Sequence, residues 1–440
     1  MTGEVPALGA GRWGGLRLRL LHWLLTPGAW LRPTAAARLR GWTRVLDWRD
    51  AVARGQRRAI VRSAVAMPVR AWREAGRAVE RFGVEVEAVC GVPPRVQRRQ
   101  LWWLAVRHGL NATSYLDFQL YRRERRRRAA AYLQEREYFR VGRWLNRTVP
   151  GTDGYPIADK HRFVAWCRAN SLAAVPTLLE YEQGALVTSA LADPASSLPR
   201  RDLFSKPNDG TGGQGTERWR HVTLPDGGAG WMGSDGRVRS AADLLQELAR
   251  ASEAIASKHG RAARRILLQP CLHNHRELLP LTPGGLCTVR VVTYRAPGAG
   301  GRVLLGAYKM PVGDSPADNF HFGGIVAPVD VATGRLGTAI RRQGRVLVSV
   351  ERHPDTGAPI TGHRLPCWAE TMALAAAALD AAHRRPSIGW DIAITDDGPV
   401  LVEGNTLSNP DIAQAPTGIP LSDTPFPAAI EAHVRACLLA

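Results

Sequence analysis

The character of the sequence changes near residue 150, and this change limits the folds open to the chain. Before it, stretches rich in Arg and Leu with few Gly or Pro favour helices, expected at 96–108 and 115–144. After it, short β-rich runs alternate with Gly and Pro turns, and hairpins without a regular βαβ array indicate an α+β fold. The predicted strands span 203–206, 218–224, 265–271, 288–294, 303–309, 324–329, 389–395 and 399–403, and the predicted helices span 159–170, 241–258 and 368–383.

Charge separates the same two regions. Residues 1–150 hold 30 Arg against 11 acidic residues, which accounts for nearly all of the formal net charge of +20, and they hold nine of the 14 Trp. We therefore expect residues 1–150 to form a basic, Trp- and Arg-rich helical domain. The run 121–128, with six Arg, is consistent with a solvated helix face, an acidic-polymer site or an anionic membrane surface, which Trp13, Trp23 and Trp30 also suit.

The absence of certain motifs and segments restricts the partners and the cellular location that we expect. Nucleic acid is an unlikely partner, because no recognition motif occurs. No apolar stretch is long enough to span a membrane, no convincing signal peptide is present, and the six Cys show no C-x-x-C spacing. We therefore expect a cytoplasmic protein with reduced thiols, whose basic region allows a peripheral location at the inner membrane surface.

Lysine is rare, with four Lys against 55 Arg. A Lys retained in such a composition indicates a position that needs a compact ammonium group. Lys206 lies in the strongest local signal, residues 204–215, in which Gly210, Gly212 and Gly215 fit G-x-G-x-x-G. A strand follows this loop where the dinucleotide fingerprint requires a helix. The segment therefore predicts a glycine-rich flap over phosphates beside Lys206, and an ordinary hairpin is the alternative.

A second signal is a hydrophobic hairpin at residues 389–405. Glu403 and Asn405 are two residues apart and share one face of their strand, and Asp391 lies on the facing strand. Two carboxylates and an amide oxygen form a hard-oxygen site that suits Mg²⁺, which completes its shell with water and phosphate oxygens. The alternative is a polar strand end next to a common Asp-Gly turn.

Two cations lie on strands that otherwise look buried, Arg290 in 288–295 and Lys309 at the end of 303–309. A buried unpaired charge is costly, so each cation needs a phosphate, a carboxylate or an internal salt bridge. His321 and His353 lie in the polar loops 318–324 and 353–357 and are acid–base candidates, although loop histidines are commonly just solvated.

Taken in order, these segments resemble the ATP-grasp superfamily, and more narrowly the sugar-transfer-associated ATP-grasp family. The resemblance covers about residues 155–415. It implies two α+β subdomains that clasp ATP, at 151–268 and 269–440, after the helical domain. The residues that carry it are Asp159-Lys160, Lys206-Pro207 with the loop 210–215, 288–293, Asp318-Asn319, Gly323-Gly324, 353–357, 389–391 and 403–405.

The resemblance also implies roles for particular residues. Mg²⁺ would be held by Asp391, Glu403 and Asn405. Arg290 and Lys309 would face the γ-phosphate and an acyl phosphate and, with Asn319, would be catalytic. The residues implied to bind ATP are Lys160, Lys206, Gly210, Gly212, Gly213, Gly215, Gln269 and Leu272, and those implied to contact substrate are Thr288, Asp318, His321, His353 and Asp355.

The activity implied is an ATP- and Mg²⁺-dependent ligase. A carboxylate attacks the γ-phosphorus of ATP to give an acyl phosphate, and an amine then displaces phosphate to form an amide. The expected substrate is a sugar or glycan precursor, an amino acid or a small peptide. Two alternatives are a phosphotransferase that acts on a hydroxyl and a non-enzymatic basic module that binds an acidic glycan or membrane surface.

Overall fold

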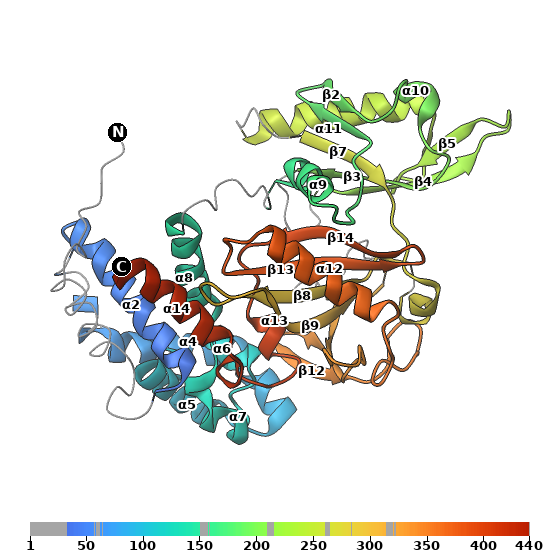
Figure 1. Cartoon of the computed structure of the whole chain (residues 1–440). Coiled ribbons are helices and arrows are strands. Elements are labelled where there is room, and N and C mark those ends of the chain that lie inside the picture. The colour runs from blue at the N-terminus through green and yellow to red at the C-terminus, as the bar shows by residue number, and fades with distance from the viewer. Residues whose placement is uncertain are drawn as a thin grey trace.

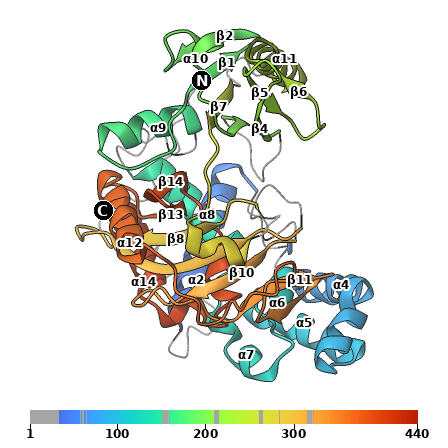
Figure 2. The same cartoon turned by 90° about the vertical axis from the view of Figure 1, so that its right-hand side faces the viewer.

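The computed structural model describes residues 33–56, 58, 62–63, 65–149, 157, 159–208, 215–259, 265–282, 284–313, 320 and 323–439. Within them, a helical part precedes two antiparallel sheets, and one sheet lies above the other in both views (Figures 1 and 2). The helical part, coloured blue to teal, packs beside the second sheet. This arrangement confirms the predicted α+β class with a mostly helical N-terminal region.

The helical part consists of short and medium-length helices. They are α2 (Ala35–Ala53), α4 (Met67–Cys90), α5 (Pro94–His108), α6 (Ala112–Asp117), α7 (Arg123–Arg127), the 3₁₀ turn η1 (Ala129–Ala131) and α8 (Glu135–Thr148). The expected continuous helix over 115–144 is wrong, because the chain leaves the helix after Asp117 and Gln119 takes a left-handed φ of 50°. Phe118 and Tyr121 are buried in this turn, and their burial outweighs the helix propensity of the Arg-rich run.

Two hydrophobic clusters attach the helices to the second half of the chain. The first joins α2 and α8 to α14 (Phe426–Leu439) and includes Leu39, Trp42 and Val434. The second joins α4, α5 and the turn after α6 to Val346 of the second sheet. The helices therefore complete their cores with residues that follow them by 200 positions or more.

The first sheet has the strand order β2-β1-β7-β3-β4-β5-β6 among the described residues. Trp219, Trp231 and Leu268 are in its core, together with Leu244 and Leu248 of the helix that covers it. Its strands are β1 (Leu179–Glu182), β2 (Ala185–Ser189), β3 (Leu203–Pro207), β4 (Glu217–Thr223), β5 (Ala229–Met232), β6 (Val238–Arg239) and β7 (Arg265–Pro270), and its helices are α9 (Lys160–Ala169), α10 (Pro194–Ser197) and α11 (Ala241–His259).

The second sheet has the order β12-β11-β10-β9-β8-β13-β14. The strand predicted at 288–294 has those bounds in the structure, since its β-branched residues suit a buried strand. The strands are β8 (Thr288–Tyr294), β9 (Arg302–Met310), β10 (Ile325–Val329), β11 (Ala339–Gln343), β12 (Val346–Val350), β13 (Ser387–Thr395) and β14 (Gly398–Asn405). The helices are η2 (Arg276–Leu281), α12 (Trp368–Ala381), α13 (Asp411–Gln414), η4 (Leu421–Asp423) and α14.

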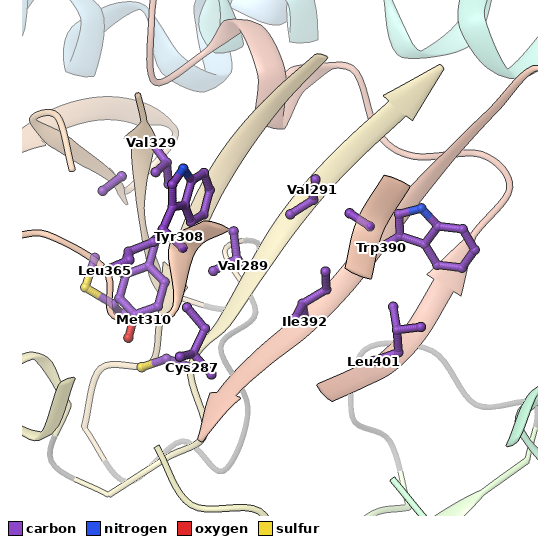
Figure 3. Packing of buried hydrophobic residues seen from close by; sticks show 14 of the residues in the cluster. Cys287, Val289, Val291, Tyr308, Met310, Val329, Leu365, Trp390, Ile392 and Leu401 are labelled. Atoms are coloured by element: carbon purple, nitrogen blue, oxygen red, sulfur yellow. The ribbon is translucent and has the colours of Figure 1, made fainter. Parts of the chain in front are cut away.

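The two faces of the second sheet differ. One face buries Val289, Val291 and Ile392, which Figure 3 shows side by side, together with residues of α12. The opposite face carries the alternate residues of the same strands, and the short helix α13 covers part of it at Ala307 and Val326. Among the described helices, none combines the length and the hydropathy needed to cross a membrane.

Candidate active site

A cluster of opposite charges lies on the second sheet, on the face opposite to the one that buries Val289, Val291 and Ile392. Strand register places Asp391 opposite Arg290, and Lys309 opposite Thr288, on three adjacent strands. Nε and Nη2 of Arg290 donate to Oδ1 and Oδ2 of Asp391 at 2.5 and 2.8 Å, and Nζ of Lys309 lies 3.3 Å from Oδ1. The structure thus brings together three residues to which the sequence analysis gave two different roles, metal binding for Asp391 and catalysis for Arg290 and Lys309.

The cluster controls the ionisation of its carboxyl group. Burial alone would raise the pKa of Asp391, but the adjacent charges of Arg290 and Lys309 outweigh it and hold that pKa below its usual range. Asp391 is therefore a carboxylate at neutral pH. The small residue Gly389 leaves room for this arrangement, because a Cβ there would lie 3.1 Å from Cδ of Arg290 and 2.4 Å from Cβ of Ser408.

Glu403 and Asn405 lie next to this cluster on β14. Glu403 pairs in register with Asp391, and Asn405 pairs with Gly389. Nδ2 of Asn405 donates to Oε1 of Glu403 at 3.2 Å, which directs the amide oxygen of Asn405 away from the carboxylate. Both side chains are half-buried.

These residues fit a divalent cation. Two adjacent carboxylates and an amide oxygen are hard ligands of the kind that Mg²⁺ prefers, and partial exposure of Glu403 and Asn405 leaves access for phosphate oxygens and water. Asp391 already shares both of its oxygens with Arg290, so Glu403 and Asn405 provide the more open part of the site. The metal-binding roles of all three residues stay predictions.

Lys206 faces this site from the first sheet. It lies on β3 with 8% of its side chain exposed. Burial, and then the charge of Lys160, lower the pKa of Lys206 to about 8, against the opposing effect of Glu403. Lys206 therefore interacts with a second cation from α9 and with a carboxylate of the second sheet. These charges, which come from three segments of the chain, are therefore close enough to affect the ionisation of Lys206.

The start of α9 is held in place by its neighbours. Asp159 caps the helix by accepting hydrogen bonds from the amides of His161 and Arg162, and the amide of Lys160 donates to the carbonyl of Asn208 at 3.2 Å. His161 also contacts the buried carboxylate of Glu180. Sequence reasoning missed Glu180, although its position in Leu-Glu-Tyr-Glu, where alternate residues share a strand face, was an available signal.

The glycine-rich loop joins two antiparallel strands, β3 and β4, as the sequence predicts. A strand follows the loop, and this geometry excludes the helix that a dinucleotide fingerprint requires. Gly215 has a φ of 72°, and a Cβ there would lie 3.2 Å from Pro207. Gly210, Gly212 and Gly213 lie outside the described residues, and so do Asp318, Asn319 and His321.

The expected adenine-binding segment connects the two sheets. Gln269 is buried on β7, where its side-chain amide donates to the carbonyl of Val175 and to Oγ1 of Thr177 at 3.3 and 3.2 Å. Leu272 is half-buried in the crossing that follows β7. The crossing ends where the amide of His275 donates to Ile394 of the second sheet. Gln269 thus holds the neighbouring segment in place, and its contact with adenine stays a prediction.

His353 and Asp355 contact the chain shortly after Lys309, at Pro311 and Gly313. Nε2 of His353 lies 3.0 Å from the carbonyl oxygen of Pro311, and its Nδ1 accepts a hydrogen bond from the amide of Asp355. Oδ2 of Asp355 accepts from the amide of Gly313 at 2.7 Å. Both side chains therefore hold the loop that follows β9. The structure shows no acid–base partner for His353 among the described residues.

A cavity of about 380 Å³ lies between α6, α8 and α13, and its lining includes Asn111, Phe139 and Asp411. Asp411 follows Asn405 by six residues and is 7% exposed. Burial, and then the nearby carboxylates of Asp117 and Glu135, raise the pKa of Asp411 well above its usual value. Sequence reasoning did not single out this residue.

The solved structures that resemble this chain include three distant likenesses with different names. D-cycloserine synthetase is 14% identical over 64% of this chain and 70% of that chain, with a TM-score of 0.32. Biotin carboxylase from Campylobacter jejuni is 10% identical over 65% of this chain and 47% of that chain, with a TM-score of 0.37. D-alanyl-alanine synthetase A from Vibrio cholerae is 11% identical over 65% of this chain and 66% of that chain, with a TM-score of 0.35.

This chain spans about half the length of the biotin carboxylase. No curated protein matches this chain. TM-scores as low as those of these solved structures do not show which residues form the site of this chain. A profile described as sugar-transfer associated ATP-grasp, however, matches residues 144–423, which is more than half of the chain and includes both sheets. The chain therefore belongs to the sugar-transfer associated ATP-grasp family.

Proposed function

We propose that the chain is an ATP- and Mg²⁺-dependent ligase that joins a carboxylate to an amine. One observation carries the proposal: the Arg290–Asp391–Lys309 cluster and Glu403 lie on one sheet, and the buried Lys206 interacts with Glu403 from the other. Cations on both sides of a pair of carboxylates form a site for a polyanion and a divalent cation.

In this proposal, the chain's own residues position the nucleotide. Lys160 and Lys206 contact its phosphates, under the glycine-rich flap. Glu403, Asn405 and Asp391 would hold Mg²⁺, which supplies charge neutralisation at phosphate oxygens. Asp391 also keeps the guanidinium of Arg290 in a fixed orientation, so that Arg290 and Lys309 present positive charge where the transferred phosphoryl group develops negative charge.

The reaction needs no covalent protein intermediate. A carboxylate oxygen attacks the γ-phosphorus, the bond to the β,γ-bridging oxygen breaks, and ADP leaves. The acyl phosphate is then attacked at its carbonyl carbon by an uncharged amine. The amide forms, inorganic phosphate leaves with the bond electrons, and the amine gives up its proton to solvent or phosphate. A sugar or glycan precursor, an amino acid or a small peptide is the proposed substrate class.

The first test is nucleotide binding, because it needs no substrate. ATP with Mg²⁺ at ~100 times its dissociation constant should stabilise the wild-type protein by ~2.7 kcal/mol, read as a rise in the unfolding temperature. We expect Glu403→Gln to lose most of the Mg²⁺-dependent rise. Glu351→Gln, an exposed residue at the second sheet's far edge, should keep it. Folded wild-type protein without any rise would overturn the nucleotide site.

The second test separates the ligase from a phosphotransferase. A panel of amino acids and sugar acids is incubated with ATP, Mg²⁺ and hydroxylamine, which converts an acyl phosphate into a hydroxamate. Hydroxamate formed in proportion to ADP supports the ligase. ADP formed only with hydroxyl compounds, without hydroxamate, would instead establish a phosphotransferase and refute the amide-forming step.

A further inference from the structure

The helices α4 and α5 form an antiparallel pair at the outer edge of the molecule (Figure 2). The inner face of α4 buries Ala75, Phe82 and Val86 against α5 and the second sheet. The pair is far along the sequence from the charged cluster and has no part in the proposed reaction. The proposed reaction therefore does not account for the residues on the outer face of the pair.

The outer face is apolar at one end. Val69 and Trp72 of α4 are three residues apart and are 58% and 39% exposed, and Trp103 of α5 is 50% exposed. Val65, which precedes the N-cap of α4, is 78% exposed. The ring centroid of Trp102 lies 6.3 Å from that of Trp72 and 6.2 Å from that of Trp103. These five residues, here called the Trp patch, form one exposed apolar surface, and such surfaces mark interaction sites.

Arginines surround the Trp patch. The guanidinium of Arg98 lies 4.2 Å from the ring centroid of Trp72, and that of Arg107 lies 5.6 Å from the ring centroid of Trp103. Arg73 follows Val69 by four residues and Arg99 precedes Trp103 by four, so each lies one helical turn from the patch. Residues 67–108 hold eight Arg and four Glu, and the surface is therefore positive.

We propose that the Trp patch docks the protein on an anionic lipid bilayer as a peripheral membrane protein. Valine and indole side chains insert at the boundary between headgroups and acyl chains, where Trp is favoured, and the surrounding arginines meet lipid phosphates.

A membrane fits this surface better than an acidic glycan does. Sugar rings stack on open indole faces, but Arg98 covers a face of Trp72, and the indole Nε1 of Trp102 donates to the carbonyl of Pro68 at 3.0 Å. Val65 and Val69 offer no hydrogen bond to a sugar hydroxyl. Aliphatic side chains between the cations instead match the apolar interior of a bilayer.

The test is sedimentation of the full chain with vesicles of phosphatidylcholine alone and of phosphatidylcholine mixed with phosphatidylglycerol. We expect binding to the anionic vesicles only, weakening as salt is added. Arg73→Glu with Arg99→Glu should weaken it by about thirtyfold or more, since each arginine near the surface contributes about fivefold. Arg250→Glu with Arg302→Glu makes the same charge change at exposed positions of α11 and β9, outside the Trp patch, and should keep most of the binding.

A second pair of variants tests insertion rather than charge. Val69→Asp and Val84→Asp change the same residue type at exposed positions of the same helix, and only Val69 belongs to the Trp patch. We expect Val69→Asp to lose about tenfold or more in binding and Val84→Asp to change it less than about twofold. Equal effects of the two variants, or binding of the wild type to an acidic polysaccharide but not to anionic vesicles, would overturn the proposal.

Discussion

Replacement of Asp391 by Asn provides the most informative single perturbation of the site. The change preserves the shape of the side chain but removes the charge that both Arg290 and Lys309 contact. The side chains of Arg290, Lys309 and Asp391 are 11%, 10% and 6% exposed, so water cannot replace the lost carboxylate. Loss of one partner from a buried pair costs about 3–5 kcal/mol, a large part of the usual stability of a domain.

The assay is urea unfolding of the protein in EDTA without nucleotide, followed by circular dichroism. We expect Asp391→Asn to lower the free energy of unfolding by about 3–5 kcal/mol. Asp397→Asn, in the exposed turn of the same hairpin, should change it by less than about 0.5 kcal/mol. These conditions isolate charge pairing, because no metal is present to be lost.

The pH dependence provides an independent check. The pKa of Asp391 in the folded protein lies below its usual value, so its contribution to stability is present above about pH 4, where the unfolded chain ionises, and disappears as the pH falls further. The difference between wild type and Asp391→Asn should therefore shrink in acid. A variant as stable as the wild type at pH 7 would refute the cluster.

Three further predictions concern neighbouring residues. The pKa of Lys206 is lowered to about 8, so the wild type should gain stability from pH 8 to 10, by about 3 kcal/mol at most, and Lys206→Met should lack this gain in parallel urea titrations. Gly389→Ala should cost about 1–3 kcal/mol and reduce ATP affinity in calorimetry, whereas Gly300→Ala, with open space around its Cβ, should do neither. His353→Leu should lower the unfolding temperature through its lost contact with Pro311 and leave ATP affinity unchanged; a loss of affinity would assign it a direct role.

Local patterns predicted β3, β4, β7, β8, β9, β10, β13 and β14, because alternation and short apolar runs are local properties, but they missed β1, β2, β5, β6, β11 and β12. The sequence also pointed to Asp391, Arg290 and Lys309, but it gave them different roles and could not show that they contact one another. Their contact depends on the register between β8 and β13, whose paired residues are about 100 positions apart, and no local pattern encodes that register. The continuous helix expected over 115–144 failed for a related reason, since burial of Phe118 and Tyr121 against distant residues outweighed local propensity.

The packing of α2 against α14 has a consequence for how the chain is made. Arg38 and Glu431 bond at 2.9 Å, and Leu39 and Trp42 are buried by side chains such as Val434. At a synthesis rate of about 5–20 residues per second, α2 waits roughly 20–80 s for its partner helix. During that time α8 covers part of its apolar face, and the part that α14 buries has no native cover. A ribosome-bound chaperone therefore has a defined client segment, and slowed translation near residue 430 should increase aggregation of the nascent protein.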